Sequence, residues 1–162
     1  MFSVYDGPDA HCILLSKRPT ALVGLRNVLE HNAAQLDRVS DYAALDSALV
    51  ADPDINVVMI DLDSYDSVIA RVEALSHLRF VHRDRPTILL SEDFETDEFG
   101  MHRRMLGDVS LRVPVLHASL EIALLQAPVN NLEWRRHLEE MSSEPVRVVN
   151  RARHEAIMHS GA

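Results

Sequence analysis

The stretch Ile55-Asn56-Val57-Val58-Met59-Ile60-Asp61 decides the fold class. It is rich in β-branched and apolar residues and shows no regular alternation of apolar with polar side chains, which is typical of a strand buried on both faces. Strands of this kind occur in parallel sheets that helices cover on both sides. The run ends abruptly at an aspartate, so the sequence predicts that Asp61 lies at the carboxyl edge of such a sheet.

Shorter apolar runs flank this strand along the chain, and helical patterns separate them. The further strand candidates are residues 12–15, 36–39, 87–90 and 109–113. Helical spacing of apolar residues covers 19–31, 41–51, 66–81 and 115–127. The acidic stretch 92–98 leads into a poorly patterned helix with Phe99, Met105 and Leu106. Within 66–81, the spacing assigns the buried face to Ile69, Val72, Leu75 and Leu78. The alternation predicts an α/β fold in which helices cover both faces of a five-stranded parallel sheet.

A helical extension is predicted beyond this core. Pro128 interrupts the last core helix, and Asn130 or Asn131 is in position to cap a further helix. The apolar face of that helix consists of Trp134, Leu138 and Met141. From residue 142 onward the pattern fades, and we expect a frayed tail.

Composition narrows the class of function. The chain has 162 residues, 47% of them hydrophobic, and a net charge of −9, which disfavours a surface for nucleic acid or anionic membranes. A single cysteine excludes an internal disulfide framework and a cysteine-rich zinc site. The longest apolar runs are far below the ~20 residues that a membrane span needs, and the amino terminus lacks a basic leader. We therefore expect a cytoplasmic protein.

In sheets of this class, functional groups lie at the carboxyl ends of the strands. Those ends hold Ser16 and Lys17, then Asp61, Ser91 and Val113. The runs Cys12–Pro19, Gly24–Glu30, Val57–Leu62, Pro86–Ser91 and Val113-Pro114, taken in their order and spacing, resemble a response-regulator receiver domain. The run Gly24–Glu30 is similar to receivers attached to LuxR/NarL-type DNA-binding domains.

The resemblance implies a CheY-like, flavodoxin-like fold with strand order 2-1-3-4-5. It divides the chain into a flexible arm at 1–10, a receiver-like domain at 11–127, and a helical extension and tail at 128–162. It places Asp61 on the phospho-acceptor position and Asp63 and Ser91 beside it. The family holds Mg²⁺ with an acidic pair, where this chain has Ser16 and Lys17. The family's phosphate-contacting lysine is replaced by Val113.

These departures indicate an atypical, non-enzymatic response regulator without a Mg²⁺ cofactor or another metal. Lys17 can serve as an internal substitute for the metal by pairing with Asp61, or it can be an exposed loop residue. Two other functions stay open: a phospho-accepting receiver that uses Asp61, and a small-molecule-sensing pseudo-receiver.

Signalling is then expected to proceed through a protein partner or a histidine kinase, with no nucleic acid bound directly by this chain. The chain either stands alone or is part of a longer transcription regulator. We also expect a homodimer, formed by the last receiver helix and the extension. The contact residues predicted for it are Leu120, Leu124, Trp134, Leu138 and Met141.

Overall fold

The computed structural model describes residues 10–18, 23–31, 34–100, 103 and 105–159, and for residues 23 and 144–159 only the backbone. The predicted arm at 1–9 lies outside the described residues. Ala10 is buried, and its carbonyl accepts a hydrogen bond from the Gln35 N–H at 2.9 Å, so Ala10 is part of the domain and not of an arm.

The sheet agrees with the predicted topology. It contains five parallel strands in the order β2-β1-β3-β4-β5. The strands are β1 (His11–Leu15), β2 (Gln35–Val39), β3 (Val57–Asp61), β4 (Thr87–Ser91) and β5 (Val109–Arg112). Every residue of β3 and β4 is buried, because helices lie on both sides of the sheet.

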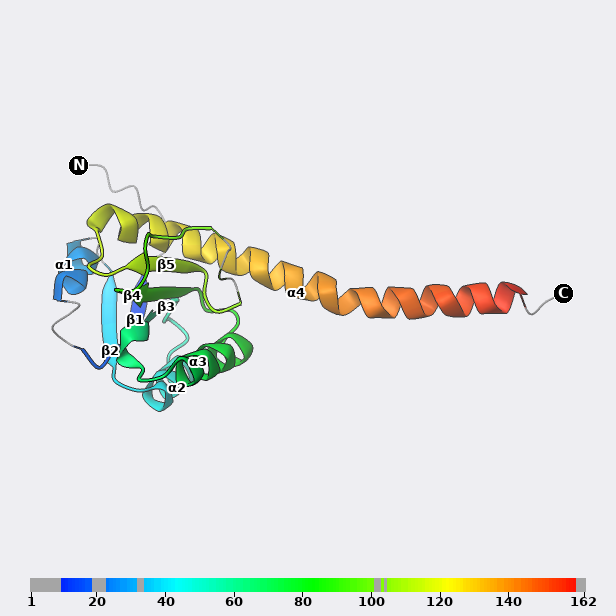
Figure 1. Ribbon diagram of the computed structural model, residues 1–162, viewed down its shortest axis with the longest axis horizontal. Helices are drawn as coiled ribbons and strands as arrows, with labels where there is room; N and C mark the ends of the chain where they lie inside the picture. The colour runs from blue at the N-terminus through cyan, green and yellow to red at the C-terminus, as the bar shows by residue number, and fades with distance from the viewer. Residues whose placement is uncertain (1–9, 19–22, 32–33, 101–102, 104, 160–162) are drawn as a thin grey trace.

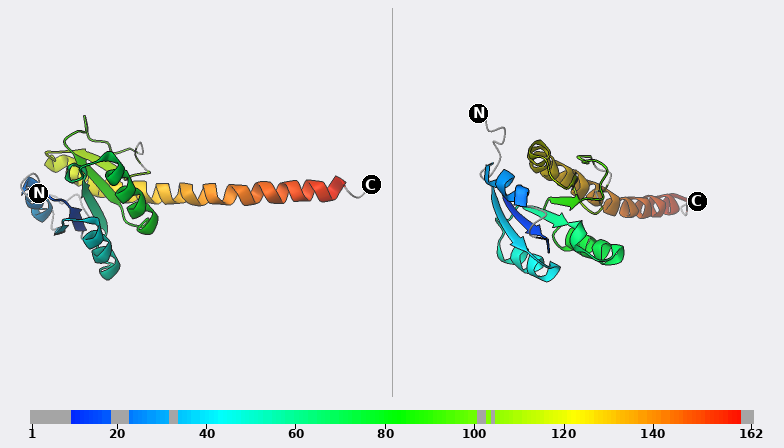
Figure 2. Two further views of the ribbon diagram at one scale, coloured as in Figure 1. Left: turned by 60° about the horizontal axis from the view of Figure 1, so that its bottom comes forward. Right: turned by 60° about the vertical axis from the view of Figure 1, so that its left-hand side comes forward.

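The helices form two layers (Figures 1 and 2). They are α1 (Val23–His31), α2 (Tyr42–Ala51), α3 (Val68–Val81) and α4 (His117–His159), with a short 3-10 turn η1 (Leu62–Ser64) after β3. Helices α1 and α4 cover one face of the sheet, and α2 and α3 cover the other. Asp41 caps α2 as predicted, since its carboxylate accepts from the Ala44 N–H at 2.8 Å.

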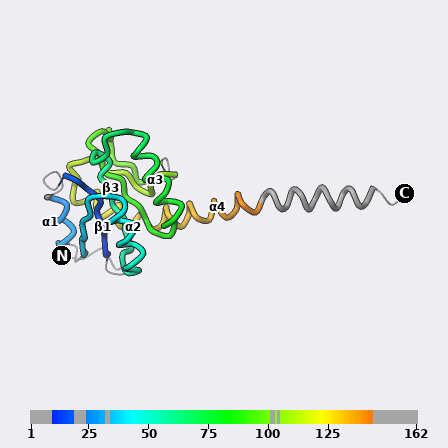
Figure 3. Tube along the Cα trace, turned by 90° about the horizontal axis from the view of Figure 1, so that it is seen from below, coloured from blue at the N-terminus to red at the C-terminus, as the bar shows by residue number. Residues whose placement is uncertain are grey.

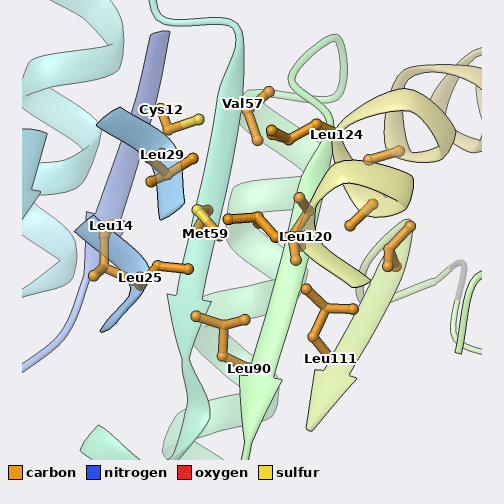
Figure 4. Close-up of a cluster of buried hydrophobic side chains, with 14 of the residues drawn as sticks. Cys12, Leu14, Leu25, Leu29, Val57, Met59, Leu90, Leu111, Leu120 and Leu124 are labelled. Carbon is orange, nitrogen blue, oxygen red and sulfur yellow. The ribbon is translucent and has the colours of Figure 1, made fainter. Parts of the chain in front are cut away.

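Alternate residues of the central strands feed two separate hydrophobic cores. Val57 and Met59 point toward α1 and α4, whereas Val58 and Ile60 point toward α2 and α3. Figure 4 shows the first of these clusters, in which Leu120 and Leu124 of α4 lie against β3, β4 and β5. The sheet is thus the shared middle layer of two cores.

Two sequence predictions about helices are wrong. The poorly patterned helix predicted around Phe99, Met105 and Leu106 is not formed at its described residues, which lie in turns and bends, and Glu98 just before it pairs with Ser110 in an antiparallel bridge. This bridge satisfies the backbone of Glu98 at the edge of β5, so the loop covers an edge that would otherwise be unpaired. In α3, Leu75 and Leu78 are buried as predicted, but Ile69 and Val72 are 72% and 42% exposed.

Helix α4 also differs from its prediction, because it runs through Pro128 without a break. The Asn130 and Asn131 amides do not cap a new helix. They donate instead into the domain, from Asn130 to the carbonyls of Phe99 and Asp108, each at 2.8 Å, and from Asn131 to the Arg83 carbonyl at 3.1 Å. Tertiary contacts therefore accompany a continuous helix where local sequence favours an interruption.

Helix α4 contacts α3, in the opposite helix layer, next to a buried ion pair. Arg79 of α3 donates to both carboxylate oxygens of Asp108, at 3.0 and 2.9 Å, and its guanidinium lies 3.9 Å from the centre of the Trp134 ring. Beyond this point α4 leaves the domain (Figures 1 and 3). None of the helices in the described part of the chain has the length and hydropathy required to cross a bilayer.

Candidate functional site

The carboxyl ends of β1, β3 and β4 bring polar side chains together, as the sequence predicts. Asp61 is the last residue of β3, Ser91 is the last residue of β4, and Ser16 directly follows β1. All three residues are at least 99% buried. The site is therefore a polar cluster enclosed by the sheet edge, with Asp61 at its centre.

Asp61 is fully hydrogen-bonded within the protein. One of its oxygens, Oδ2, accepts from the Ser16 hydroxyl at 2.8 Å and from the Ser64 hydroxyl at 2.9 Å. The other, Oδ1, accepts from the Asp63 N–H at 3.2 Å. Both oxygens also accept from one guanidinium, that of Arg18, with Nε to Oδ2 at 3.1 Å and Nη2 to Oδ1 at 3.0 Å.

Arg18 connects three carboxylates. Besides its bidentate contact with Asp61, its Nη2 donates to Asp63 at 3.1 Å and its Nη1 to Glu92 at 3.5 Å. The Arg18 side chain is 29% exposed, whereas the Asp61 side chain is 0% exposed. The planar guanidinium suits this arrangement, because its donors form a fixed fork that matches carboxylate geometry.

Of the two alternatives for Lys17, the structure shows the exposed loop residue and not the pairing with Asp61. Lys17 is exposed, and its described contact with the site is its main-chain N–H, which donates to the Ser64 hydroxyl at 2.9 Å. The cation beside Asp61 is Arg18, one residue later in the chain. Side chains alternate between the two faces of the sheet only as far as Leu15, where β1 ends. Strand periodicity therefore does not predict which side chain of the following turn points toward Asp61.

The electrostatics of the site favour an ionised Asp61. Burial alone would raise the pKa of this carboxyl, but the hydrogen bonds from Arg18, Ser16 and Ser64 outweigh it and bring the pKa below its usual range. The carboxylates in turn raise the pKa of Arg18 above its already high value, chiefly through the hydrogen bond with Asp61. The pair is consequently charged on both sides at neutral pH.

Ser91 and Asp63 complete the cluster on the β4 side. The Ser91 hydroxyl donates to Asp63 Oδ1 at 2.7 Å, and the Glu92 N–H donates to Asp63 Oδ2 at 2.8 Å. Asp63 thus links the turn after β3 to the turn after β4. Val113 lies beside this edge with 5% exposure, and its N–H donates to the Ser91 carbonyl at 3.1 Å. An apolar side chain therefore occupies the position where a receiver has lysine.

The residues at this edge do not fit the Mg²⁺ site that receiver domains use. Such a site needs several convergent oxygen ligands, and here a guanidinium lies between the carboxylates of Asp61 and Asp63. Ser16 and Lys17 bring no carboxylate to replace the family's acidic pair. In the part of the chain that the structure describes, no group of three His, Cys, Asp or Glu side chains is placed to hold a metal ion.

The residues predicted for a dimer contact are largely unavailable. Leu120 and Leu124 are 0% and 2% exposed in the hydrophobic core, and Trp134 is 7% exposed beneath Arg79. Leu138 is half-buried and Met141 is 57% exposed. The apolar stripe that α4 does expose lies on its opposite side, at Ile122, Leu125, Val129 and Leu132. Its spacing of three and four residues is the signal in the sequence that identifies this stripe.

The topology and strand-end geometry define a CheY-like fold of the kind seen in response-regulator receiver domains. A pilus assembly-related protein of Burkholderia pseudomallei is one solved structure similar to this chain, with 18% identity, a TM-score of 0.60, and coverage of 75% of this chain and 90% of that chain. A receiver domain of an HD domain-containing protein of Pseudomonas fluorescens matches with 16% identity, a TM-score of 0.60, and coverage of 79% and 93%.

A CheY-like receiver domain of Methylobacillus flagellatus is similar as well, with 21% identity, a TM-score of 0.57, and coverage of 73% of this chain and 98% of that chain. At these identities the likeness establishes the fold. No protein-family model matches the sequence, and comparison with curated proteins finds no significant match.

Proposed function

We propose that this chain is an atypical receiver domain that signals through protein contacts and not through Mg²⁺-dependent phosphorylation. One observation carries the proposal: the guanidinium of Arg18 binds both oxygens of Asp61 and one of Asp63. In this arrangement the chain supplies its own cation at the position where the fold family binds a metal ion.

The chemistry of Asp61 supports this proposal. A phospho-accepting carboxylate must attack phosphorus with an oxygen lone pair, and cations must neutralise the developing charge. Both Asp61 oxygens already accept hydrogen bonds from Arg18, and Oδ2 accepts two hydroxyl donors as well. The position of the family's lysine holds Val113, which carries no charge. The site is thereby held in one arrangement.

Signalling by this chain then depends on its protein-binding surfaces and not on a catalysed reaction. We propose that the chain has no enzymatic activity, acts in the cytoplasm, and binds a protein partner or a histidine kinase without contacting nucleic acid itself. Receiver domains among the structural neighbours support a place in a response-regulator pathway. We propose in addition that this pathway controls transcription. We also propose that the chain works as a homodimer.

The test is a titration with Mg²⁺ and beryllofluoride, a mimic of the phosphoryl group, followed by amide NMR shifts of Asp61, Asp63 and Ser91. We expect no saturable change in the wild-type chain. Saturable shifts that disappear in Asp61→Asn would overturn the proposal and favour a phospho-accepting receiver. Arg18→Ala is the informative companion variant, because a gain of Mg²⁺ binding there would show that the guanidinium excludes the ion.

A further inference from the structure

The outer side of α4 carries an apolar stripe that no part of the described chain covers. Ile122, Leu125, Val129 and Leu132 are 48%, 44%, 57% and 51% exposed. Leu120, Ala123, Leu124 and Ala127, on the opposite side of the same helix, are at most 2% exposed. The helix therefore has two apolar sides, of which one faces the core and the other faces solvent.

The spacing of the outer stripe matches the seam of a coiled coil. Consecutive members are separated by three, four and three residues, which places Ile122 and Val129 at a positions and Leu125 and Leu132 at d positions of a heptad. Positions b, c and f hold the buried residues, so the domain core and the seam use separate sides of the helix. A stripe of this kind packs against a copy of itself by placing knobs into holes.

Charges beside the seam discriminate between the two directions of pairing. In a parallel pair, a g residue lies near the e residue of the next heptad in the partner. Position g holds Arg135 and the following e position holds Glu140, so each of the two symmetric contacts joins opposite charges. The other such pairs, Glu121 with Gln126 and Pro128 with Glu133, contain no like charges. An antiparallel pair would not bring Arg135 to Glu140.

Arg136 occupies the next a position of the seam. A polar residue at a single a position restricts the number of strands at some cost in stability. The helix itself continues to His159 and leaves the domain as a single rod (Figure 1). An isolated helical segment in water is marginally stable, so a second helix alongside it is favourable.

We propose that two copies of this chain associate in parallel through Ile122, Leu125, Val129 and Leu132 of α4, with Arg135 of each copy facing Glu140 of the other. This surface rests on the proposed function, since it supplies the contact that a non-catalytic receiver needs. It differs from the contact predicted from the sequence, in which Leu120, Leu124 and Trp134 are buried.

Sedimentation equilibrium of the full chain from 1 to 100 μM tests the surface, with these concentrations chosen to span ordinary dimer affinities of about micromolar Kd. We expect a dimer whose dissociation constant rises at least tenfold in the double variant Leu125→Glu, Val129→Glu. Val68→Glu, on α3 across the sheet, is the matched control, because Val68 is 69% exposed and lies off the seam. A monomer at all concentrations, or a dimer unaffected by the double variant, would overturn the proposal. Circular dichroism verifies that each variant is folded.

Cysteine cross-linking tests the direction. The native Cys12 is buried with its pKa raised to about 12 by that burial, so it does not compete. Leu132→Cys should form a covalent dimer on oxidation, because a parallel seam brings the two d positions together. Cross-linking only of a mixture of Ile122→Cys and Leu132→Cys chains would indicate antiparallel pairing and contradict the proposal.

The charge pair has its own test. Glu140→Arg should weaken the dimer, and adding Arg135→Glu should restore it, whereas a purely structural role of either residue predicts no rescue. Failure of the dimer leaves the Mg²⁺ and beryllofluoride result unchanged, and the reverse holds too, so the two proposals can fail separately.

Discussion

Arg18 and Lys17 are neighbours in the chain, yet only the side chain of Arg18 belongs to the strand-end cluster. Removing it in Arg18→Ala leaves the buried carboxylate of Asp61 without its cation. Breaking a buried ion pair from one side costs about 3 kcal/mol or more, and we expect that loss in the free energy of unfolding. Lys17→Ala should change it by at most about 0.5 kcal/mol. Urea denaturation at pH 7 compares the two variants, and equal losses would contradict the assignment of Arg18.

The same carboxylate predicts how stability depends on pH. The pKa of Asp61 is lower in the folded chain than in the unfolded chain, where an aspartate titrates near about 3.9. The unfolded state therefore binds a proton first as the pH falls, and the contribution of Asp61, present above about pH 4, is lost below it. We expect the stability difference between wild type and Asp61→Asn to shrink from pH 6 to pH 3.

Urea midpoints across that range measure this difference. Asp54→Asn, at an exposed aspartate, provides the control, and its difference from wild type should stay small throughout. A constant gap between wild type and Asp61→Asn would show that Asp61 does not lose its contribution in acid.

The residues of the strand-end cluster differ in how far the sequence predicts their positions. The position of Asp61 follows from its strand, and so do those of Ser16 and Ser91, because strand periodicity fixes what lies at the sheet edge. The need for a cation beside Asp61 followed from the missing acidic pair. The sequence did not show whether this cation is Lys17 or Arg18, because the turn after β1 has no regular alternation of side chains.

Among the strands and helices, the apolar pattern predicted the correct element wherever tertiary contacts favour the same structure. The five strands and their order were confirmed, since their runs of apolar residues match burial on both faces. The helix predicted around Phe99, Met105 and Leu106 is not formed at its described residues, where the chain has just paired through Glu98 with Ser110 at the sheet edge. The predicted break at Pro128 is absent because the Asn130 and Asn131 amides are engaged by the domain. Both errors come from contacts distant in sequence.

Two glycines give a matched prediction about elements. A Cβ at Gly107 would lie 2.6 Å from Cγ of Leu89, a core side chain that is 1% exposed, so the loop before β5 has no room for it. Gly107→Ala should lower the free energy of unfolding by about 1–3 kcal/mol. Gly24 of α1 has open space, and Gly24→Ala should raise it by about 0.5 kcal/mol through lower entropy of the unfolded chain. Thermal denaturation of the two variants measures both, and a loss from Gly24→Ala would contradict the prediction.

At the scale of the whole molecule, one sheet joins two cores, and this predicts a single unfolding transition. Trp134 is the only tryptophan and lies on α4 against Arg79 of α3, so its fluorescence reports on the contact between α4 and the opposite helix layer. Leu49 of α2 is 2% exposed in the core on the opposite face. Leu49→Ala should cost about 2–5 kcal/mol through lost contacts and a cavity.

Because β3 contributes alternate side chains to both cores, the loss of stability caused by Leu49→Ala should also affect the core on the opposite face of the sheet. We expect Leu49→Ala to lower the urea midpoint read by Trp134 fluorescence by the same amount as the midpoint read by far-UV circular dichroism. Protein concentration has to be equal in all samples, since association of two copies adds to apparent stability. A Trp134 transition that stays at the wild-type midpoint would show that the two layers unfold separately, and that α4 does not sense the opposite side of the sheet.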